Sequence, residues 1–205
     1  KKKQMTKGYK ATYNYKCLNQ TYEIGQEYKL NEKPILCQSG FHYCLDAKDT
    51  LTYYAYNHEF KLLEIEDLSN YTITEGLKSC SNHIKIIREI SDPDELFQLL
   101  GCIKTFDENG KELTRKDLQD NWRKCTFNEK GQLLTYEDSD GYWSVRTYNE
   151  NGNALTYKAS NGYWQEYTYN ENGQELTFKD SIGDFCEYTY DSDGNVLTQN
   201  KCLTN

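Results

Sequence analysis

Proline and long apolar runs are scarce in this sequence. It contains two Pro among 205 residues, with 37% hydrophobic, 14% aromatic and 27% charged residues. This composition excludes a disordered chain, because enough apolar and aromatic surface is present to form a core. No apolar run is long enough to span a bilayer, and the start, Lys1-Lys2-Lys3-Gln4, has no hydrophobic signal core. We therefore expect a cytoplasmic protein that does not contact a membrane.

Several motifs that carry chemistry are also missing. The sequence has no phosphate-cradling glycine loop, no Ser-His-Asp order and no paired-His helix. Its eight Cys include no CxxC pair, which argues against a zinc or redox site of that kind. His42 lies between Cys37 and Cys44, but on an extended strand a seven-residue spacing holds those two sulfurs too far apart for one metal unless the chain folds back. We predict no metal and no cofactor, and reduced thiols, with a disulfide framework as the alternative.

The negative charge is concentrated in the second half of the chain. Residues 1–92 hold 13 Lys and Arg against 12 Asp and Glu, whereas residues 93–205 hold 11 against 20. An acidic surface repels phosphate backbones, so direct binding of nucleic acid is not expected. A protein partner with a basic surface fits this charge better.

The second half repeats one 21-residue unit five times. Each copy contains one Gly at a fixed position, which we call the marker glycine, and a Leu-Thr pair begins three residues after it. Two columns of aromatic residues recur at the same period. Fixed-period repetition indicates a repeat architecture whose function depends on a surface rather than a pocket. The glycines are Gly110, Gly131, Gly152, Gly173 and Gly194, and the aromatic columns are Phe106, Phe127, Tyr148, Tyr169, Tyr190 and Trp122, Trp143, Trp164, Phe185.

These patterns predict a mainly β protein in three parts. Residues 1–92 read as an α+β domain of short strands, with a possible helix over residues 45–56 and a buried strand over residues 84–90. Residues 93–105 read as a short linking helix, since Asp92 can cap it and Pro93 suits its first position. Residues 106–205 read as five β-hairpins in one open, curled antiparallel sheet.

The turn sequences predict how the hairpin strands pair. Asn161-Gly162 and Asp140-Gly141 are typical of two-residue turns in which both central residues have positive φ. Such a turn at Asn161 places Ala159 opposite Trp164 and Tyr157 opposite Glu166. The Leu, Tyr/Phe and Trp columns then share one buried face, and Thr, Lys, Gln and the remaining Tyr share the other.

The polar tyrosine face is the candidate binding site. Tyrosine offers a large contact area with few rotors and is enriched where proteins bind proteins. The alternative is that the Tyr and Thr columns only stabilise a sheet that is wet on one side. An open edge strand could also pair two copies into a homodimer. The predicted partner-binding residues are Tyr142, Tyr163, Tyr167 and Tyr188, with Asp140, Glu150 and Glu171 at the rims.

The first half also offers an enzymatic alternative. Lys7 to Ala11, then Ser39-Gly40-Phe41-His42, then Tyr53-Tyr54, then Leu62 to Glu66 resembles the strand order of ADP-ribosyltransferase folds. The resemblance implies a Glu that steers the ribose and a basic residue that holds the cofactor. Here Lys10 stands where those enzymes have Arg or His, and the interval from Ser39 to Glu66 is short.

Two further resemblances suggest a setting for the protein. Lys7-Gly8-Tyr9-Lys10-Ala11, the Tyr22-x-x-Gly25-x-x-Tyr28 run and Cys37-x-x-Gly40-Phe41-His42-Tyr43-Cys44 resemble an uncharacterised domain of phage and mobile-element proteins. The Tyr-x-x-x-Gly-x-x-Leu-Thr spacing after residue 106 resembles YD-type (Rhs-like) hairpin repeats. The setting implies a non-enzymatic protein of the bacterial cytoplasm that blocks a defence nuclease, CRISPR effectors included, by occluding its basic groove. An immunity or adhesion-type interaction module is the other non-enzymatic hypothesis.

Overall fold

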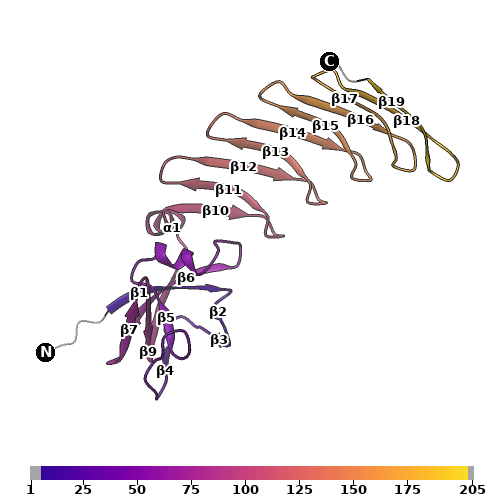
Figure 1. Ribbon diagram of the computed structural model, residues 1–205. Coiled ribbons are helices and arrows are strands. Elements are labelled where there is room, and N and C mark those ends of the chain that lie inside the picture. Colours follow the sequence, from indigo (N-terminus) through magenta and orange to yellow (C-terminus); the bar gives the residue numbers. More distant parts are fainter. Residues whose placement is uncertain (1–5, 203–205) are drawn as a thin grey trace. The chain divides into compact units, whose positions relative to one another are not determined.

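A computed structural model describes residues 6–202, and it is mainly β as the sequence predicts (Figure 1). The chain divides into two compact units after Gln119. Unit 1 holds a six-stranded sheet in the order β3-β2-β1-β6-β9-β4 and a three-stranded sheet in the order β5-β8-β7, counted over the described residues. The strands of the larger sheet are β1 (Thr6–Tyr13), β2 (Lys16–Cys17), β3 (Gln20–Thr21), β4 (Glu27–Lys29), β6 (Phe60–Asp67) and β9 (His83–Ile90), and those of the smaller are β5 (Phe41–Tyr43), β7 (Thr72–Glu75) and β8 (Lys78–Ser81).

The central strand β6 buries both of its faces, so unit 1 has two apolar clusters. Leu63 and Ile65 are fully buried on one face, and Leu62 is buried on the other. Full burial of each such side chain contributes about 1.5–3 kcal/mol. The first cluster is Tyr22, Phe41, Tyr43, Leu63, Ile65, Ile84 and Ile86, and the second is Ala11, Ala47, Phe60, Leu62, Ile90 and Leu100.

A bulge in β9 explains how one isoleucine-rich strand serves both clusters. Ile65 pairs with Ile86, but the neighbouring Glu64 pairs with Arg88, so Ile87 is the extra residue. An extra residue reverses which side chains face which side of the sheet. Ile84 and Ile86 therefore join the first cluster and Ile90 the second.

Helix α1 (Pro93–Leu100) forms where the sequence predicts it. The Asp92 carboxylate accepts a hydrogen bond from the Glu95 amide at 2.9 Å, Pro93 occupies the first turn, and Gly101 ends the helix at φ 74°. Asp92 thus provides an acceptor for a free amide at the start of the helix, and Gly101 adopts the left-handed conformation that ends it. The hairpin of β10 (Cys102–Phe106) and β11 (Glu112–Asp117) completes unit 1.

The helix expected over residues 45–56 is only a short 3-10 helix, η1 (Lys48–Thr52). The Asp46 carboxylate accepts from the Lys48 amide, and the Thr50 hydroxyl donates to the Ala47 carbonyl at 2.6 Å. Local side-chain bonds of this kind compete with a longer helix.

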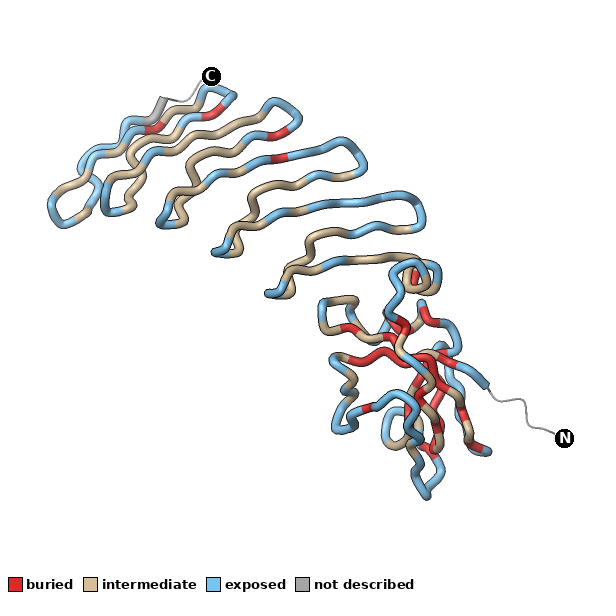
Figure 2. Tube along the Cα trace, turned by 180° about the vertical axis from the view of Figure 1, so that it is seen from behind, coloured by how far each residue is buried: buried red, intermediate tan, exposed pale blue. Residues whose placement is uncertain are grey.

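Unit 2 is an antiparallel meander in which strands follow one another in chain order. Few of its residues are buried, among them Ser144, Ala159, Asp180 and Cys186 (Figure 2). Its described strands are β12 (Trp122–Phe127), β13 (Leu133–Asp138), β14 (Trp143–Tyr148), β15 (Ala154–Ala159), β16 (Trp164–Tyr169), β17 (Glu175–Asp180), β18 (Phe185–Tyr190) and β19 (Val196–Cys202).

The register predicted for these hairpins is wrong by one residue. The Ala159 amide donates to the Tyr163 carbonyl at 2.9 Å, so the loop has three residues, and only its third, Gly162, has positive φ (85°). Lys158 then pairs with Trp164 and Tyr157 with Gln165. A one-residue shift exchanges the faces of a whole strand. The predicted pairings of Ala159 with Trp164 and of Tyr157 with Glu166 therefore do not form.

The faces of the sheet differ accordingly from the prediction. The tryptophans share a face with the Thr, Lys and Glu columns, and we call this the Trp face. Trp122 and Trp143 are 41% and 43% exposed, so this column is not buried as predicted. Tyrosines of both predicted groups share the opposite face, which we call the Tyr face. Its ring-bearing members include Tyr136, Tyr142, Tyr157, Tyr163, Tyr167, Tyr169, Phe178 and Tyr188, as the pairing and ring contacts show.

Candidate functional site

The four predicted tyrosines all lie on the Tyr face. Tyr142 is 37% exposed, and Tyr163, Tyr167 and Tyr188 are half-buried. The predicted rim residues lie in the loops that join the strands, and all three of them are exposed. They are Asp140, Glu150 and Glu171.

A row of tyrosine rings crosses the first three hairpins of unit 2. The Tyr142 ring lies 5.9 Å from that of Tyr136, and its hydroxyl is 2.7 Å from the Tyr157 hydroxyl. The Tyr157 ring in turn lies 6.1 Å from that of Tyr163. Arg146 packs its guanidinium 4.7 Å from the centre of the Tyr157 ring. Such contacts fix the rings in place, so little rotor freedom remains to be lost when a partner binds.

A second group of the Tyr face centres on a buried carboxylate. The Tyr163 hydroxyl donates to Asp180 at 3.3 Å and accepts from the Gln165 amide at 2.9 Å. Asp180 also caps its own loop, since its carboxylate accepts from the amides of Ile182 and Asp184. Further along the sheet, Tyr167 packs on Phe178 with ring centres 5.1 Å apart.

Burial, and after it nearby carboxylates, raise the pKa of these phenols. Burial raises the pKa of Tyr163, and the charge of Asp180 raises it further. Burial also raises the pKa of Tyr167 and of Tyr188, and Glu175 adds to both shifts. A phenol whose pKa is raised stays protonated and able to donate a hydrogen bond at neutral pH.

Sequence reasoning missed four members of this face. Tyr136 and Tyr157 carry the ring row, while Arg146 and Asp180 are its charged members. Part of the signal was present, because Tyr157 lies six residues before Tyr163 and a three-residue loop places both on one face. Arg146 and Asp180 reach that face by pairing with Tyr157 and Gln165. The two-residue turn assumed for Asn161-Gly162 assigned Tyr157 to the wrong face.

The Trp face is more exposed and more regular. Within each hairpin of unit 2 two threonine hydroxyls meet across the strand pair at 2.6–2.7 Å. Beside them Lys179 forms an ion pair with Glu166 at 2.6 Å and lies 5.9 Å from the centre of the Trp164 ring. Cross-strand pairs of this kind stabilise a solvated sheet face. The threonine pairs are Thr126–Thr135, Thr147–Thr156, Thr168–Thr177 and Thr189–Thr198.

The residues of the enzymatic alternative converge only in part: Lys10, His42, Tyr53 and Tyr54 line one pocket of unit 1, but the glutamate lies elsewhere. Lys10 pairs with Leu63 and faces the first apolar cluster, whereas Glu64 pairs with Tyr9 and faces the opposite side of the sheet. There Glu64 is held by Lys7 at 2.8 Å and by Arg88 at 2.6 Å. These hydrogen bonds, first that of Lys7, lower the pKa of the Glu64 carboxyl.

Cys37, His42 and Cys44 do not lie on one extended strand as assumed from the sequence: β5 begins at Phe41, the segment before it turns back so that Ile35 bridges Ser39, and all three residues line one pocket. His42 accepts a hydrogen bond from the Cys37 amide at 2.9 Å, while the Cys44 thiol is buried. Over residues 6–202 no three His, Cys, Asp or Glu side chains gather as metal ligands would. No helix in that same range is long and apolar enough to cross a membrane.

Comparison with known proteins identifies a domain in unit 1. Residues 6–98 match the family described as Domain of unknown function (DUF7666). No curated protein matches the chain.

Among solved structures the chain is similar to toxin complexes that contain TccC3. In the crystal structure of TcdB2-TccC3-Cdc42 the identity is 21% and the TM-score 0.38, and the match covers 68% of this chain and 7% of that chain. In the Tc holotoxin pore of Photorhabdus luminescens, which carries a mutant TccC3, the identity is 20%, the TM-score 0.38, and the coverage 69% and 7%.

Proposed function

We propose that unit 2 is a non-enzymatic protein-binding platform and that its Tyr face contacts the partner. The observation that carries the proposal is the ring row of Tyr136, Tyr142, Tyr157 and Tyr163, fixed by mutual contacts and still partly open to solvent. Rigid tyrosines with polar tips are typical of protein interfaces.

The charge of unit 2 favours a basic partner. Residues 120–205 contain 14 Asp and Glu against seven Lys and Arg. On the Tyr face the carboxylates of Glu175 and Asp180 act on the phenols, and Arg146 is packed on a ring. A face of this sign attracts a positively charged surface and accelerates its association at low salt.

The specific form of this function that we propose is inhibition of a bacterial defence nuclease. A nucleic-acid groove is lined with Lys and Arg, so it offers the charge that the Tyr face complements. Occupation of the groove by unit 2 would exclude the nucleic acid by competition. The phage setting is a prediction from the resemblance given above, and the cytoplasmic location is a prediction from the lack of a long apolar run and of a signal core in the sequence.

The binding face is tested with matched variants on the two sides of one hairpin. The Tyr142→Ser/Tyr157→Ser double variant removes the hydroxyl pair of the Tyr face, and Trp143→Ser removes a more exposed ring from the Trp face. The native chain and each variant are immobilised separately and exposed to purified candidate nucleases, CRISPR effectors included, at a series of salt concentrations. We expect salt-sensitive binding that the double variant loses by at least tenfold and that Trp143→Ser retains.

Two results would overturn the proposal. Loss of binding with Trp143→Ser alone would assign the interface to the Trp face. Binding to no nuclease, or binding without loss of cleavage, would remove the inhibitory function. In that case an immunity or adhesion-type partner becomes the next candidate.

A further inference from the structure

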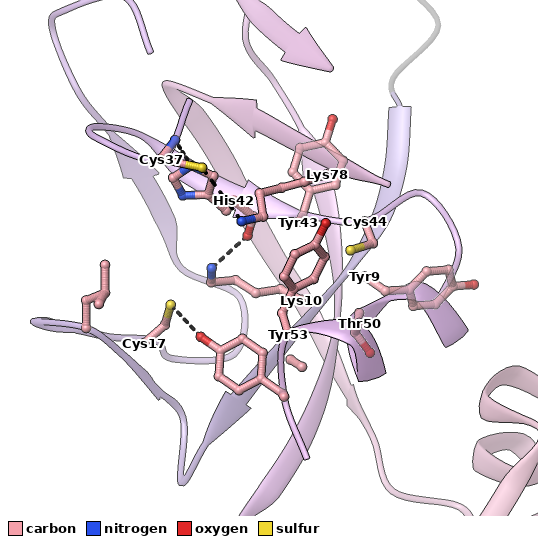
Figure 3. A pocket seen from close by; sticks show the side chains of 13 residues that line it. Tyr9, Lys10, Cys17, Cys37, His42, Tyr43, Cys44, Thr50, Tyr53 and Lys78 are labelled. Carbon is pink, nitrogen blue, oxygen red and sulfur yellow. Dashed lines mark hydrogen bonds between the residues drawn. The ribbon is translucent and has the colours of Figure 1, made fainter. Parts of the chain in front are cut away.

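Unit 1 contains a pocket that the proposed function does not use. It has a volume of about 320 Å³ and lies beside β1, β5 and the end of η1 (Figure 3). This volume is within the range of small-molecule sites. Its lining residues are Tyr9, Lys10, Ala11, Cys17, Leu18, Cys37, His42, Tyr43, Cys44, Thr50, Tyr53, Tyr54 and Lys78.

The charge of the pocket is opposite to that of the protein. Its lining includes Lys10 and Lys78 but no Asp or Glu, although the chain has a net charge of -8. The Lys10 amine donates to the His42 carbonyl at 2.7 Å, and the Lys78 amine lies 3.9 Å from the Cys37 sulfur. Within the described residues, neither amine contacts a carboxylate. Two cations without counter-charges favour an anion.

Burial makes the positive charge of Lys10 costly. Lys10 is 3% exposed, and desolvation lowers its pKa, an effect that the nearby Cys17 thiol opposes. Burial, together with the charges of Lys10 and Lys78, lowers the pKa of His42, so both ammonium groups act on the same imidazole. An anion beside these groups would offset the desolvation of Lys10 and stabilise its protonated form.

The remaining wall of the pocket is aromatic and apolar. The Tyr53 ring is 43% exposed and has the Lys78 amine 4.2 Å from its centre. Tyr54 is fixed by a hydrogen bond from its hydroxyl to the Cys17 sulfur at 2.8 Å. Leu18 adds an apolar side chain that is 93% exposed. A flat ring can stack on such a surface while its charged substituent reaches the lysines.

We propose that this pocket binds a small organic anion that carries a flat ring, with the anionic group held by Lys10 and Lys78 and the ring placed against Tyr53 and Tyr54. The site is independent of the Tyr face, since all its residues belong to unit 1.

The test uses the full chain and three probes that separate charge from ring. Phenyl phosphate carries both features, phenol has the ring alone, and inorganic phosphate has the charge alone. Titration calorimetry and backbone amide shifts should show binding of phenyl phosphate, at least tenfold weaker binding of inorganic phosphate and none of phenol. Binding should also take up protons near the lowered pKa of Lys10.

Variants that remove charge but keep length assign the site. Lys78→Met and Lys10→Met should each weaken phenyl phosphate at least tenfold, because each removes a charge-assisted contact. Lys29→Met, an exposed residue of β4 outside the pocket, is the control and should change nothing. Because Lys10 is buried, its variant is first checked for native amide shifts, and Lys78→Met gives the result if Lys10→Met does not fold.

Three outcomes would contradict the proposal. Failure of phenyl phosphate to bind would remove the site altogether. Equal binding of phenyl phosphate and phosphate would remove the role of the ring. Unchanged affinity in Lys78→Met and in a folded Lys10→Met would place the anion elsewhere.

Discussion

The side-chain amide of Gln132 donates to the Gly152 carbonyl, 20 residues later, at 2.7 Å. Gln174 repeats this bond with Gly194 at 2.8 Å, and Asn153 makes the corresponding bond to Gly173 at 3.4 Å. Amide side chains thus connect the loop of one hairpin to the loop of the next. In these three repeats the contact is made by the residue that follows the marker glycine.

Loss of this contact should weaken the repeats. We expect Gln132→Leu to lower the free energy of unfolding of unit 2 by about 1 kcal/mol, because a loop carbonyl loses its donor. Asn153→Leu should cost less, since its bond is longer. Asn153→Gln, which extends the amide by one methylene, should instead stabilise the sheet by up to about 0.5 kcal/mol.

Urea unfolding followed by tryptophan fluorescence measures these changes. All three tryptophans, Trp122, Trp143 and Trp164, belong to unit 2, so the signal reports on the repeats alone. Equal losses for Gln132→Leu and Asn153→Leu would show that the amide bonds do not determine the stability.

The hairpin loops give a second prediction about stability. Gly162 has φ 85° with nothing close to its Cβ position, so Gly162→Ala should cost about 1–2 kcal/mol through backbone strain alone. Asn161 has no positive φ, and its carboxamide oxygen accepts from the Tyr163 amide at 3.0 Å. Asn161→Asp keeps that acceptor and should be nearly neutral.

The same urea experiment decides the loop type. Gly162→Asn should cost less than Gly162→Ala, because Asn tolerates positive φ. Asn161→Ala should lose only its hydrogen bond, about 1 kcal/mol. If Asn161→Gly instead stabilises the sheet, position 161 has positive φ and the loop has two residues.

Much of this fold could be predicted from the sequence, and the register could not. The 21-residue period predicted hairpins, and Asp92 with Pro93 predicted the start of α1. Asn161-Gly162 is compatible with a two-residue and with a three-residue loop, because both need a glycine at their last position. The loop length decides on which face of the sheet Trp164 lies relative to Tyr157. The assumed two-residue loop therefore led to the wrong prediction of the buried face.

The pocket in unit 1 was hidden from the sequence for a different reason. Lys10, His42 and Lys78 are far apart in the chain and belong to β1, β5 and β8. Sequence alone placed Lys10 in an enzymatic motif and His42 in that motif and in a metal motif, and it assigned no role to Lys78. The pairing of Tyr9 with Cys44 and the hydrogen bond from Lys10 to His42 join the first two, and such long-range contacts have no local signal.

The ion pairs of Glu64 predict how unit 1 responds to acid. Hydrogen bonds from Lys7 and Arg88 lower the pKa of Glu64, and Arg88 also lowers the pKa of Glu95. A carboxyl whose pKa is lower in the folded state stabilises the fold above its unfolded pKa, about 4.3, and this stability is lost as pH falls through the folded pKa. Arg88→Met removes a donor from both, so unfolding on acidification should begin at a higher pH.

Methyl resonances of Ile84 and Ile86 follow that transition, since both side chains are fully buried in unit 1. Lys16→Met, which removes an exposed cation from β2, is the matched control and should leave the midpoint unchanged. If Arg88→Met and Lys16→Met share the midpoint of the native chain, the two carboxyls are not stabilised by Arg88.

The thiols of unit 1 should react in a fixed order. Cys37 is exposed, whereas Cys44 and Cys80 are 3% and 0% exposed. Burial raises the pKa of Cys44 to about 11, and it also raises the pKa of Cys80. Because only the thiolate attacks an alkylating reagent, roughly a thousandth of Cys44 is reactive at pH 8.

Iodoacetamide should therefore label Cys37 at least a hundredfold faster than either buried thiol, as peptide mass spectrometry of quenched samples would show. In urea the three rates should converge, since unfolding exposes Cys44 and Cys80 and removes the effect of burial on their pKa. Labelling of Cys44 as fast as that of Cys37 in the native protein would mean that strand β5 and the segment that follows it open readily, and the pocket beside them would then have no fixed wall.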